Sequence, residues 1–358
     1  MKKIISVLLI TLIITFSFSG CFMFESVISD SSIPRENAGL IVHFIDVGQG
    51  DCVLLESGDS FALIDAGEYS ESKNVVSYLN NANVDSLEYI ISTHPHSDHC
   101  GGLSEVIRNF DSSVLISPNA DSDSDAWEYV LDAADERGLV YETPQVNETY
   151  PLGEAAITIL SPDTDAIYSN LNDYSIVCKV EYKNTSFLLT GDAETVVEKE
   201  LVRSGLDISA NVLKCGHHGS STSSCKEFLD AVNPSAAVIS CGKNNDYGHP
   251  HQETLDALNA RSIPMWRTDV SGTIVILSDG EKISINSAAD GESHFDADTN
   301  SKPSDPSAPA YIGNKNSMVF HLPSCTAIDT MNSENKVNLK DRQEATDRGY
   351  TPCGSCKP

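Results

Sequence analysis

Basic residues are scarce in this chain. Its 358 residues include 23 Lys and Arg against 52 Asp and Glu, so the formal net charge is −29 at pH 7. Residues 311–358 hold six basic and five acidic side chains, whereas the preceding 310 residues hold 17 and 47. Such an acidic body favours solubility at a cell surface and does not attract phosphate backbones from a distance. A polyanionic substrate would therefore need metal ions or the C-terminal segment for capture.

Long apolar runs are also scarce. The stretch Ile4–Phe18 follows Lys2 and Lys3 and is too short and wrongly flanked for a typical spanning helix, which indicates a secretory signal. It ends Phe18-Ser19-Gly20-Cys21, similar to a bacterial lipobox. We expect residues 1–21 to be a lipoprotein signal peptide, Cys21 to carry lipid, and the protein to lie on the extracytoplasmic face of the cell membrane. An uncleaved signal anchor and plain secretion are the alternatives, and both also place the chain outside the cytoplasm.

The cysteines do not have the spacing of a disulfide framework, although ten cysteines in an exported protein would ordinarily suggest one. Four of the six in the body of the chain lie in or beside apolar, strand-like runs, where a free cysteine behaves as a small hydrophobe. The six are Cys52, Cys100, Cys178, Cys215, Cys225 and Cys241.

Composition divides the chain into four parts after the signal. Residues 22–38 are polar and Ser-rich, typical of a tether, and residues 39–286 have the patterning of a folded domain. Residues 287–310 are rich in Pro, Ser and Asp, which predicts a disordered linker. Residues 311–358 are too few for a large core without a staple such as a metal.

Short apolar runs alternate with amphipathic stretches through the domain, and we predict an α+β fold in which sheets are sandwiched between helices. The expected strands are 40–46, 52–56, 61–65, 87–92, 114–116, 156–160, 176–181, 186–190, 212–214, 236–240 and 273–277. The expected helices are 72–79, 103–109, 125–136, 194–204, 225–232 and 252–260.

One motif points to a metal. The run His94-Pro95-His96-Ser97-Asp98-His99 offers three imidazoles and a carboxylate within six residues, which suits zinc or a similar borderline ion better than a packed core. The strand-like residues 87–92 precede it and Gly101-Gly102 follows it. We therefore expect the ligands on a turn at the edge of a sheet, with an open coordination position.

Further motifs occur in order along the domain. They are Phe44-Ile45-Asp46-Val47-Gly48-Gln49-Gly50-Asp51, Phe61-Ala62-Leu63-Ile64-Asp65-Ala66-Gly67, Thr190-Gly191-Asp192-Ala193-Glu194 and Lys214-Cys215-Gly216-His217-His218-Gly219-Ser220. With the histidine cluster they resemble the metallo-β-lactamase superfamily, and within it the lactamase-like domain of ComEC, over residues 39–286. The resemblance implies a metallo-β-lactamase αββα sandwich and hydrolysis by a metal-activated water.

The resemblance also implies a set of metal ligands for up to two zinc or manganese ions. His94 and His96 would hold the first ion, Asp98 and His99 the second, and Asp192 would bridge them. The alternative for Asp192 is a cap of the following helix.

Four further side chains complete the expected site. His218 is the favoured last ligand of the second ion, while its neighbour His217 would stabilise the developing oxyanion. Asp65 would support a ligand histidine without itself binding metal. His249 is either a substrate contact or proton donor, or part of helix-start chemistry near Pro250.

The sequence departs from the superfamily pattern at one point. Many members have a further histidine before the bridging aspartate, but residues 100–191 contain none, and Asn172-Asp173-Tyr174-Ser175 take its place. We expect the first site to be weak, absent, or filled by a harder ion such as manganese, for which oxygen donors suffice.

The C-terminal segment has its own metal motif. His321, Cys325, Cys353 and Cys356 form a good tetrahedral zinc set, and the segment resembles the metal-binding domain of the Ada alkyl-repair protein. His321 stands where that family has its methyl-accepting cysteine, so methyl transfer should be lost. We expect a structural zinc and a surface for nucleic acid to remain. A disulfide plus a free thiol is the alternative.

These observations predict a surface-anchored, ComEC-like metallohydrolase that acts on phosphodiesters, as a nuclease. One alternative is a hydrolase of another cell-surface ester or a lactone, since fold and metals do not fix the substrate. Another is a non-catalytic, nucleic-acid-binding lipoprotein that aids DNA uptake. The expected partners are nucleic acid or another phosphodiester and, through the lipid, the membrane. The sequence indicates no dedicated protein partner.

Overall fold

A computed structural model describes residues 27–28, 32–287, 311–321, 328, 331–332, 335–340, 345 and 348–353. The chain divides into two compact units, Met1–Phe295 and Asp296–Pro358. Four predictions lie outside the described residues: the signal peptide with Cys21, nearly all of the linker, and the ligands Cys325 and Cys356. Within the described part, none of the helices has the length and hydrophobicity that crossing a bilayer requires.

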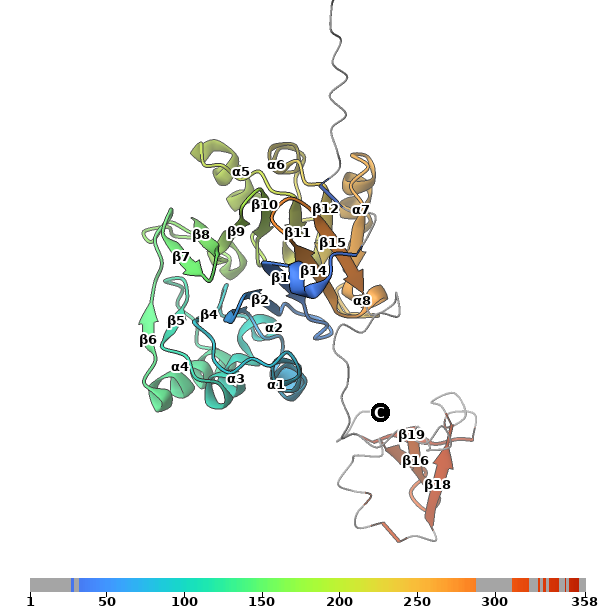
Figure 1. Cartoon of the computed structure of the whole chain (residues 1–358). Coiled ribbons are helices and arrows are strands. Elements are labelled where there is room, and N and C mark those ends of the chain that lie inside the picture. The colour runs from blue at the N-terminus through green and yellow to red at the C-terminus, as the bar shows by residue number, and fades with distance from the viewer. Residues whose placement is uncertain are drawn as a thin grey trace, which may run out of the picture. The chain divides into compact units, whose positions relative to one another are not determined.

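The first unit contains an eight-stranded sheet (Figure 1). Its strands from β14 to β3 pair antiparallel, and those from β3 to β6 pair parallel. In spatial order they are β15 (Ile283–Ser287), β14 (Ile274–Ser278), β1 (Leu40–Phe44), β2 (Val53–Ser57), β3 (Ser60–Ile64), β4 (Tyr89–Ile91), β5 (Val114–Ile116) and β6 (Val140–Glu142).

The second sheet has seven strands and the same plan. Its antiparallel part runs from β7 to β10, and its parallel part from β10 to β13. In spatial order the strands are β13 (Met265–Arg267), β12 (Ala236–Ile239), β11 (Val212–Lys214), β10 (Thr185–Leu189), β9 (Val177–Tyr182), β8 (Ala155–Ser161) and β7 (Thr149–Leu152).

Helices cover the outer faces of the two sheets. The helices are α1 (Ser72–Asn81), α2 (Ser97–Cys100), α3 (Leu103–Asn109), α4 (Asp125–Arg137), α5 (Thr195–Ser204), α6 (Lys226–Val232), α7 (Gln252–Asn259) and α8 (Thr268–Ser271). Helices α1, α3 and α4 pack on the eight-stranded sheet, and α5, α6 and α7 on the seven-stranded sheet. Local chemistry sets the ends of α4: Ser124 Oγ accepts the Trp127 N–H at its start, and Gly138, with φ +69°, ends it.

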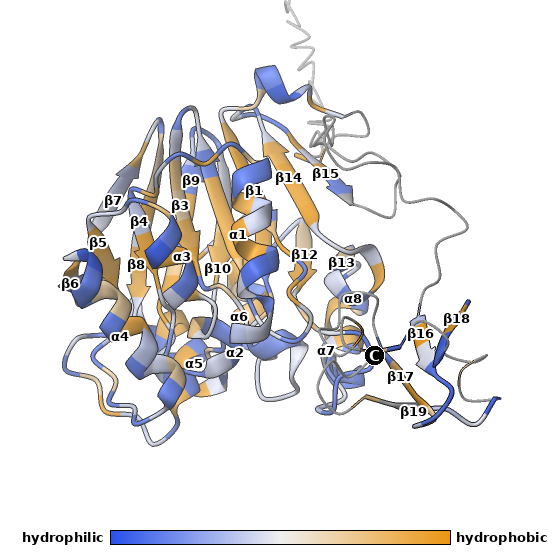
Figure 2. Cartoon of the chain, turned by 90° about the horizontal axis from the view of Figure 1, so that it is seen from below, coloured by the Kyte–Doolittle hydropathy of each residue, from blue (hydrophilic) through white to orange (hydrophobic). Residues whose placement is uncertain are grey.

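The alternation of side chains along each strand builds three apolar layers. On β1, Leu40, Val42 and Phe44 enter the core between the sheets, while the residues between them point to the other face. On β2 and β3, Leu54 and Leu63 instead pack under the helices. Figure 2 shows the result as largely hydrophobic strands, with helices in which hydrophilic and hydrophobic residues alternate. This is the αββα sandwich that the sequence predicts.

The expected elements form with boundaries shifted by at most two residues, and the structure adds several short ones. Strands β6 and β13 have only three residues each and lie at sheet edges, where Val140 and Tyr141 are exposed. Such strands have no buried face, so they carry no hydrophobic pattern. The predicted cysteine chemistry agrees with the structure: the six cysteines that the structure describes in this unit form no disulfide, and all but Cys225 are buried.

The domain begins earlier than the predicted boundary at residue 39. Ile33 is buried against Ile41, Val275 and Leu277, and its N–H donates to Ser284 Oγ at 3.0 Å. A 3₁₀ turn over Arg35–Asn37 then leads into β1. A single buried isoleucine in a polar stretch produces no periodic hydrophobic pattern. The sequence therefore assigns residues 33–38 to the tether.

The described part of the second unit contains a four-stranded sheet in the order β18 (Lys336–Leu339), β16 (Tyr311–Asn314), β17 (Val319–His321) and β19 (Thr351–Pro352). Phe320, Leu339 and Tyr350 are in its small core. Strands β17 and β19 pair in parallel, and the Cys353 N–H donates to Phe320 O at 3.0 Å. His321 thus ends β17 and Cys353 directly follows the neighbouring β19, and both side chains are buried. The zinc site itself remains a prediction.

Candidate active site

The histidine cluster lies on a short turn at the C-terminal end of β4, an interior strand of the eight-stranded sheet. Helix α2 begins directly after His96, so Asp98 and His99 lie within a single helical turn. The glycine-rich loop before β2 packs against this turn: the Asp51 N–H donates to Asp98 O at 3.1 Å. A Cβ on Gly50 would come within 2.2 Å of the same oxygen, so only glycine permits this approach.

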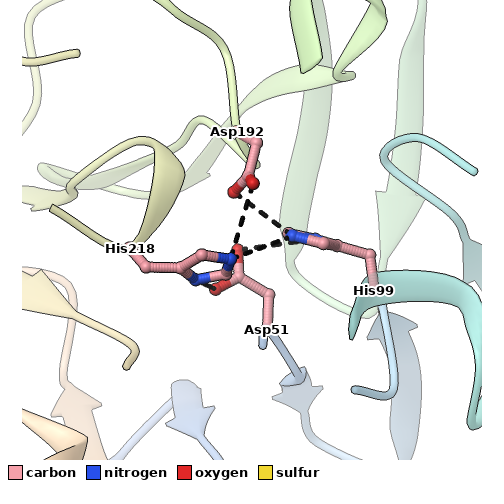
Figure 3. Close-up of side chains that lie close together, drawn as sticks. All are labelled: Asp51, His99, Asp192 and His218. Atoms are coloured by element: carbon pink, nitrogen blue, oxygen red, sulfur yellow. Dashed lines mark hydrogen bonds and ion pairs between the residues drawn. The ribbon is translucent and has the colours of Figure 1, made fainter. Parts of the chain in front are cut away.

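Four predicted metal ligands converge between the two sheets. His99 Nε2 and His218 Nε2 are 3.3 Å apart. Asp192 reaches both rings, with Oδ1 at 3.2 Å from His99 Nε2 and Oδ2 at 3.4 Å from His218 Nε2 (Figure 3). Asp98 Oδ2 lies 3.2 Å from His218 Nε2. All but Asp98 are almost fully buried.

Asp192 does not cap the helix that follows it. The residue before α5 is Glu194, and the Asp192 carboxylate instead faces the two rings. Its backbone N–H donates to Ser175 Oγ at 2.9 Å, which fixes the turn that carries it. The geometry therefore favours the ligand interpretation over the capping one.

Three residues of the site, two neighbouring histidines and one aspartate, have unusual backbone angles. His217, His218 and Asp65 have φ values of 49°, 53° and 57°, the left-handed region that non-glycine residues rarely occupy. Strain of this kind persists where the surrounding structure fixes it, and it often occurs at functional sites. Here it turns the imidazole of His218 inward and leaves that of His217 at the pocket wall.

Carboxylates lie behind the ligand rings and orient them. Asp65 Oδ2 is 2.8 Å from His99 Nδ1, and the Asp65 carboxylate also accepts hydrogen bonds from the N–H and Oγ1 of Thr93. This is the supporting position that the sequence predicts for Asp65. His218 Nδ1 lies 3.0 Å from Ser240 O and 3.4 Å from Asp51 Oδ1. Both rings are thus held with Nε2 toward the centre.

A buried ion pair completes this support. Lys214 Nζ lies 2.6 Å from Asp51 Oδ2, and the two side chains are 1% and 3% exposed. Lys214 also donates to Gly191 O and Cys215 O. The ammonium therefore links the loop of Asp51 to the strand ends that carry the bridging aspartate and the paired histidines.

The first predicted site adjoins the second. His94 Nε2 lies 3.0 Å from His96 Nδ1, so these two ring nitrogens face each other. His94 is held from behind by Thr93 Oγ1 and Ser175 Oγ, at 3.2 and 3.3 Å from its Nδ1. Ser175 belongs to the segment that stands where other superfamily members have a histidine.

Asn172 offers an oxygen beside this pair. Its Nδ2 donates to Glu194 Oε1 at 3.2 Å and lies 3.4 Å from His217 Nε2. Its Oδ1 is buried and makes no well-formed hydrogen bond within the described part of the chain. Because Asn172 lines the same pocket as His96, this oxygen is available to a cation there.

The charges of the site are strongly coupled. Burial alone would lower the pKa of His99, but Asp192, Asp65 and Asp98 together raise it well above the usual value. Burial opposes ionisation of Asp192, yet His218 and His99 hold its pKa well below the usual value. Burial and the neighbouring His99 lower the pKa of His94, so its ring is neutral and available as a ligand.

A pocket of about 290 Å³ opens onto these ligands. His217 forms part of its wall, with Nδ1 at 3.1 Å from Glu194 Oε1 and Nε2 at 3.9 Å from Asp192 Oδ2. His249 lies near His217, with ring centroids 5.3 Å apart. The lining residues are Gln49, His96, Ser97, Asp98, Asn172, Asp192, His217, His218, Tyr247 and His249.

His249 does not start the helix after it. Helix α7 begins at Gln252 with His251 at its N-cap, so His249 is free to face the pocket. Burial and the nearby His218 and His217 lower the pKa of His249 to about 4. A ring that is neutral at pH 7 fits a substrate contact better than a resident proton donor.

The sequence analysis missed several residues of the site. Asp51 groups with His99, Asp192 and His218, their ligand atoms all lying within 4.8 Å of one another, although Asp51 faces the Nδ1 side of His218. Asp51 and Lys214 both stood in recognised motifs, but nothing in either motif shows that the two meet. Gln49 and Tyr247 carried no chemical signal of their own.

The donor set fits a divalent cation. Nitrogen and carboxylate donors converge, and Asn172 Oδ1 is buried without a well-formed hydrogen bond among the described residues. Buried polar atoms are ordinarily paired, so this oxygen is open to a cation. A borderline or hard divalent ion satisfies all of these donors.

This fold and site are those of the metallo-β-lactamase superfamily. The chain belongs to the metallo-β-lactamase superfamily, whose family model matches residues 45–243. Within the superfamily, the chain is similar to curated proteins named for competence and recombination. It is 34% identical over 251 residues to ComE operon protein 3 of Bacillus subtilis, a match covering 65% of this chain and 32% of that protein.

A second relative is similar at a lower identity. Competence protein ComA of Neisseria gonorrhoeae is 30% identical over 249 residues, which cover 68% of this chain and 33% of that protein. The chain thus spans about a third of the length of these relatives. Among solved structures, the metallo-β-lactamase fold protein YhfI of Bacillus subtilis aligns with 14% identity and a TM-score of 0.47, over 69% of this chain and all of that one.

Proposed function

We propose that this protein is a metal-dependent phosphodiesterase that acts on nucleic acid. The observation that carries the proposal is the convergence of His99, His218, Asp98 and Asp192 at the floor of an open pocket. The family supports a metal-dependent hydrolase. The names of the relatives, a competence protein and a recombination protein, favour nucleic acid as the substrate.

The residues of the chain have distinct tasks in this proposal. When bound, the metal supplies an activated water and charge neutralisation in the transition state. Asp65 and Asp51 orient the ligand rings, so the site is assembled before the substrate arrives. His217, at the pocket wall beside Glu194, is placed to donate a hydrogen bond to a developing oxyanion. His249 contacts the substrate.

The two metal positions differ in their donors. His99, His218, Asp98 and Asp192 supply a mixed nitrogen and oxygen set that suits zinc or manganese. The position at His94 and His96 has Asn172 Oδ1 as its available neighbouring oxygen. A harder ion such as manganese suits that position.

The remaining parts of the proposal concern location and the second unit. A lipid on Cys21 would hold the hydrolase at the extracytoplasmic face of the cell membrane, and one structural zinc would be held by His321, Cys325, Cys353 and Cys356. The pairing of β17 with β19 supports the zinc site, because it brings Cys353, directly after β19, beside the end of β17 that carries His321.

The test uses protein lacking residues 1–21, supplied with manganese or zinc. We expect it to cleave single- or double-stranded DNA and a bis-aryl phosphate, and we expect Asp192→Asn to lose at least a hundredfold in kcat. Cleavage is followed on gels and by release of the aryl alcohol, with uptake of metal checked by elemental analysis. A metal-loaded protein that turns over neither substrate contradicts the proposal, and tight DNA binding without cleavage favours a binding role.

A further inference from the structure

An exposed aromatic ring stands at the mouth of the pocket. Tyr247 lies in the loop between β12 and α7 and is 67% exposed, although its side chain contributes to the pocket lining. Its ring stacks on His249, with centroids 5.7 Å apart and planes inclined by 17°. Aromatic rings of this size are usually buried for their apolar area. One held in water at the entrance to a catalytic pocket is placed for contact with a ligand.

The loop that carries Tyr247 is held in place by its own hydrogen bonds. Asn245 Nδ2 donates to Gly242 O and His249 O at 2.9 and 2.6 Å, and the His249 N–H donates to Asn245 Oδ1 at 3.0 Å. Gly242 N–H donates in turn to Gln49 Oε1, which ties the loop to the glycine-rich motif. The ring is therefore presented in a fixed position, which lowers the entropy lost when a ligand stacks on it.

The charge of the pocket limits how a nucleic acid can be held. None of its lining residues is lysine or arginine, and the domain around it is strongly acidic. Apart from the metal, the walls offer no lysine or arginine for the phosphates that flank the scissile bond. Stacking of a base on an aromatic ring provides affinity without charge, and it tolerates any sequence because every base has a flat face.

We infer that Tyr247 is a stacking platform for a nucleobase next to the phosphodiester that reacts at the metal site. The inference rests on the proposed function and specifies its substrate as single-stranded nucleic acid or an unpaired end. Bases inside a duplex already stack on their neighbours and would have to be unstacked first. Tyr247 thus sets specificity, while the residues at the pocket floor carry out hydrolysis.

The experiment compares two esters with the same leaving group, using the full-length chain loaded with manganese. Both thymidine 5′-(p-nitrophenyl phosphate) and bis(p-nitrophenyl) phosphate release p-nitrophenolate, but only the first carries a nucleobase. We expect the wild type to prefer the nucleoside ester, and Tyr247→Leu to reduce the ratio of the two kcat/KM values about tenfold, the usual effect of losing one stacked base. Tyr247→Trp should preserve the ratio.

The matched control is Tyr129→Leu, which removes another exposed tyrosine, 52% exposed on α4, and should leave the ratio unchanged. A second measurement follows binding of a fluorescent oligothymidylate by anisotropy in the Asp192→Asn background. There, Tyr247→Leu should weaken binding about tenfold. The inference is overturned, and the proposed function is not, if Tyr247→Leu lowers kcat/KM equally for both esters. The same holds if it changes neither the ratio of the two kcat/KM values nor the affinity for the oligothymidylate. An enzyme that hydrolyses neither ester overturns the proposed function and this inference with it.

Discussion

At the scale of single residues, the site depends on which atom of each side chain is left available. His99 and His218 each have Nδ1 beside a carboxylate or carbonyl, so Nε2 is the nitrogen that faces the centre. This arrangement selects the tautomer and fixes the direction of each ring. The side chains that do so, Asp65 and Asp51, are as important to the geometry as the ligands.

Lys214 should be essential to the stability of this arrangement. Replacing it with methionine leaves the Asp51 carboxylate buried without its partner, and removal of one member of a buried pair costs about 3–5 kcal/mol. We expect Lys214→Met to lower the free energy of unfolding by that amount in urea denaturation. The double variant Asp51→Asn, Lys214→Met should recover part of the loss.

The control for this prediction is Lys226→Met. Lys226 pairs with Asp230 on the surface of α6 and is 75% exposed. Surface pairs of this kind contribute about 0–1 kcal/mol. If the two lysine variants lose equal stability, the buried pair does not have the role assigned to it.

Asn172 should determine how many ions the protein binds. If Asn172 Oδ1 supplies a donor beside His94 and His96, Asn172→Ala should weaken manganese binding at that position about tenfold and leave the second position loaded. Isothermal titration with manganese, in parallel with elemental analysis, measures both sites. Asn74→Ala, on the exposed side of α1, is the control, and an unchanged titration for Asn172→Ala would refute the assignment.

At the scale of elements, the ends of strands and the turns after them carry the chemistry, and helices fix those turns. Helix α5 shows how: Glu198, buried on α5, accepts hydrogen bonds from the backbone N–H groups of Ser224 and Cys225, where α6 begins. One side chain thus joins the helix after the bridging aspartate to the segment after the paired histidines.

Glu198 should make this junction sensitive to pH. Burial raises its pKa from 4.5 to about 7, so the protonated form is favoured in the folded state. The stability from this group is fully present below pH 4.5 and is lost as the pH rises through 7. A shift of this size corresponds to about 3 kcal/mol.

The measurement compares the unfolding free energy of the wild type and Glu198→Gln from pH 4.5 to pH 8. The difference should move by about 3 kcal/mol in favour of the glutamine variant as the pH rises. Glu227→Gln, which removes an exposed carboxylate from α6, serves as the control. A difference that stays constant with pH would show that Glu198 is ionised in the folded protein throughout this range.

At the scale of the whole molecule, the two sheets meet at the site, and neither half forms it alone. The eight-stranded sheet supplies Asp51, Asp98 and His99, and the seven-stranded sheet supplies Asp192 and His218. A cation bound between them links the two halves of the sandwich. Metal should therefore stabilise the fold as well as enable chemistry.

Removal of metal should lower the melting temperature of the domain. An ion at a hundredfold excess over its Kd adds about 2.7 kcal/mol, equivalent to a shift of about 5–10 °C for a domain of this size. Calorimetry in manganese and in a chelator measures it. Asp192→Asn should shrink the shift, and His321→Ala separates any contribution of the second unit. Identical melting curves with and without metal would contradict a cation between the sheets.

The sequence by itself determined the elements and the donors. Periodicity located the long helices and buried strands, and the dense motif of three histidines and an aspartate specified metal chemistry because its donors are close in the chain. The structure brings His99 and His218 together beside Asp192, and their roles as ligands stay a prediction. The sequence pattern did not predict the short edge strands or the burial of Ile33, because neither produces a repeating pattern of hydrophobic residues.

Only the tertiary structure decided which residues meet. Asp51 and Lys214 are 163 positions apart, and no local signal shows that their charges pair behind the ligands. The same holds for the amide of Asn172 and the ring of Tyr247, whose roles depend on the pocket that both sheets form. The sequence specifies the chemical type of each side chain. Whether the Asn172 oxygen can bind a cation, or the Tyr247 ring can stack on a base, depends on the neighbours that the fold places beside it.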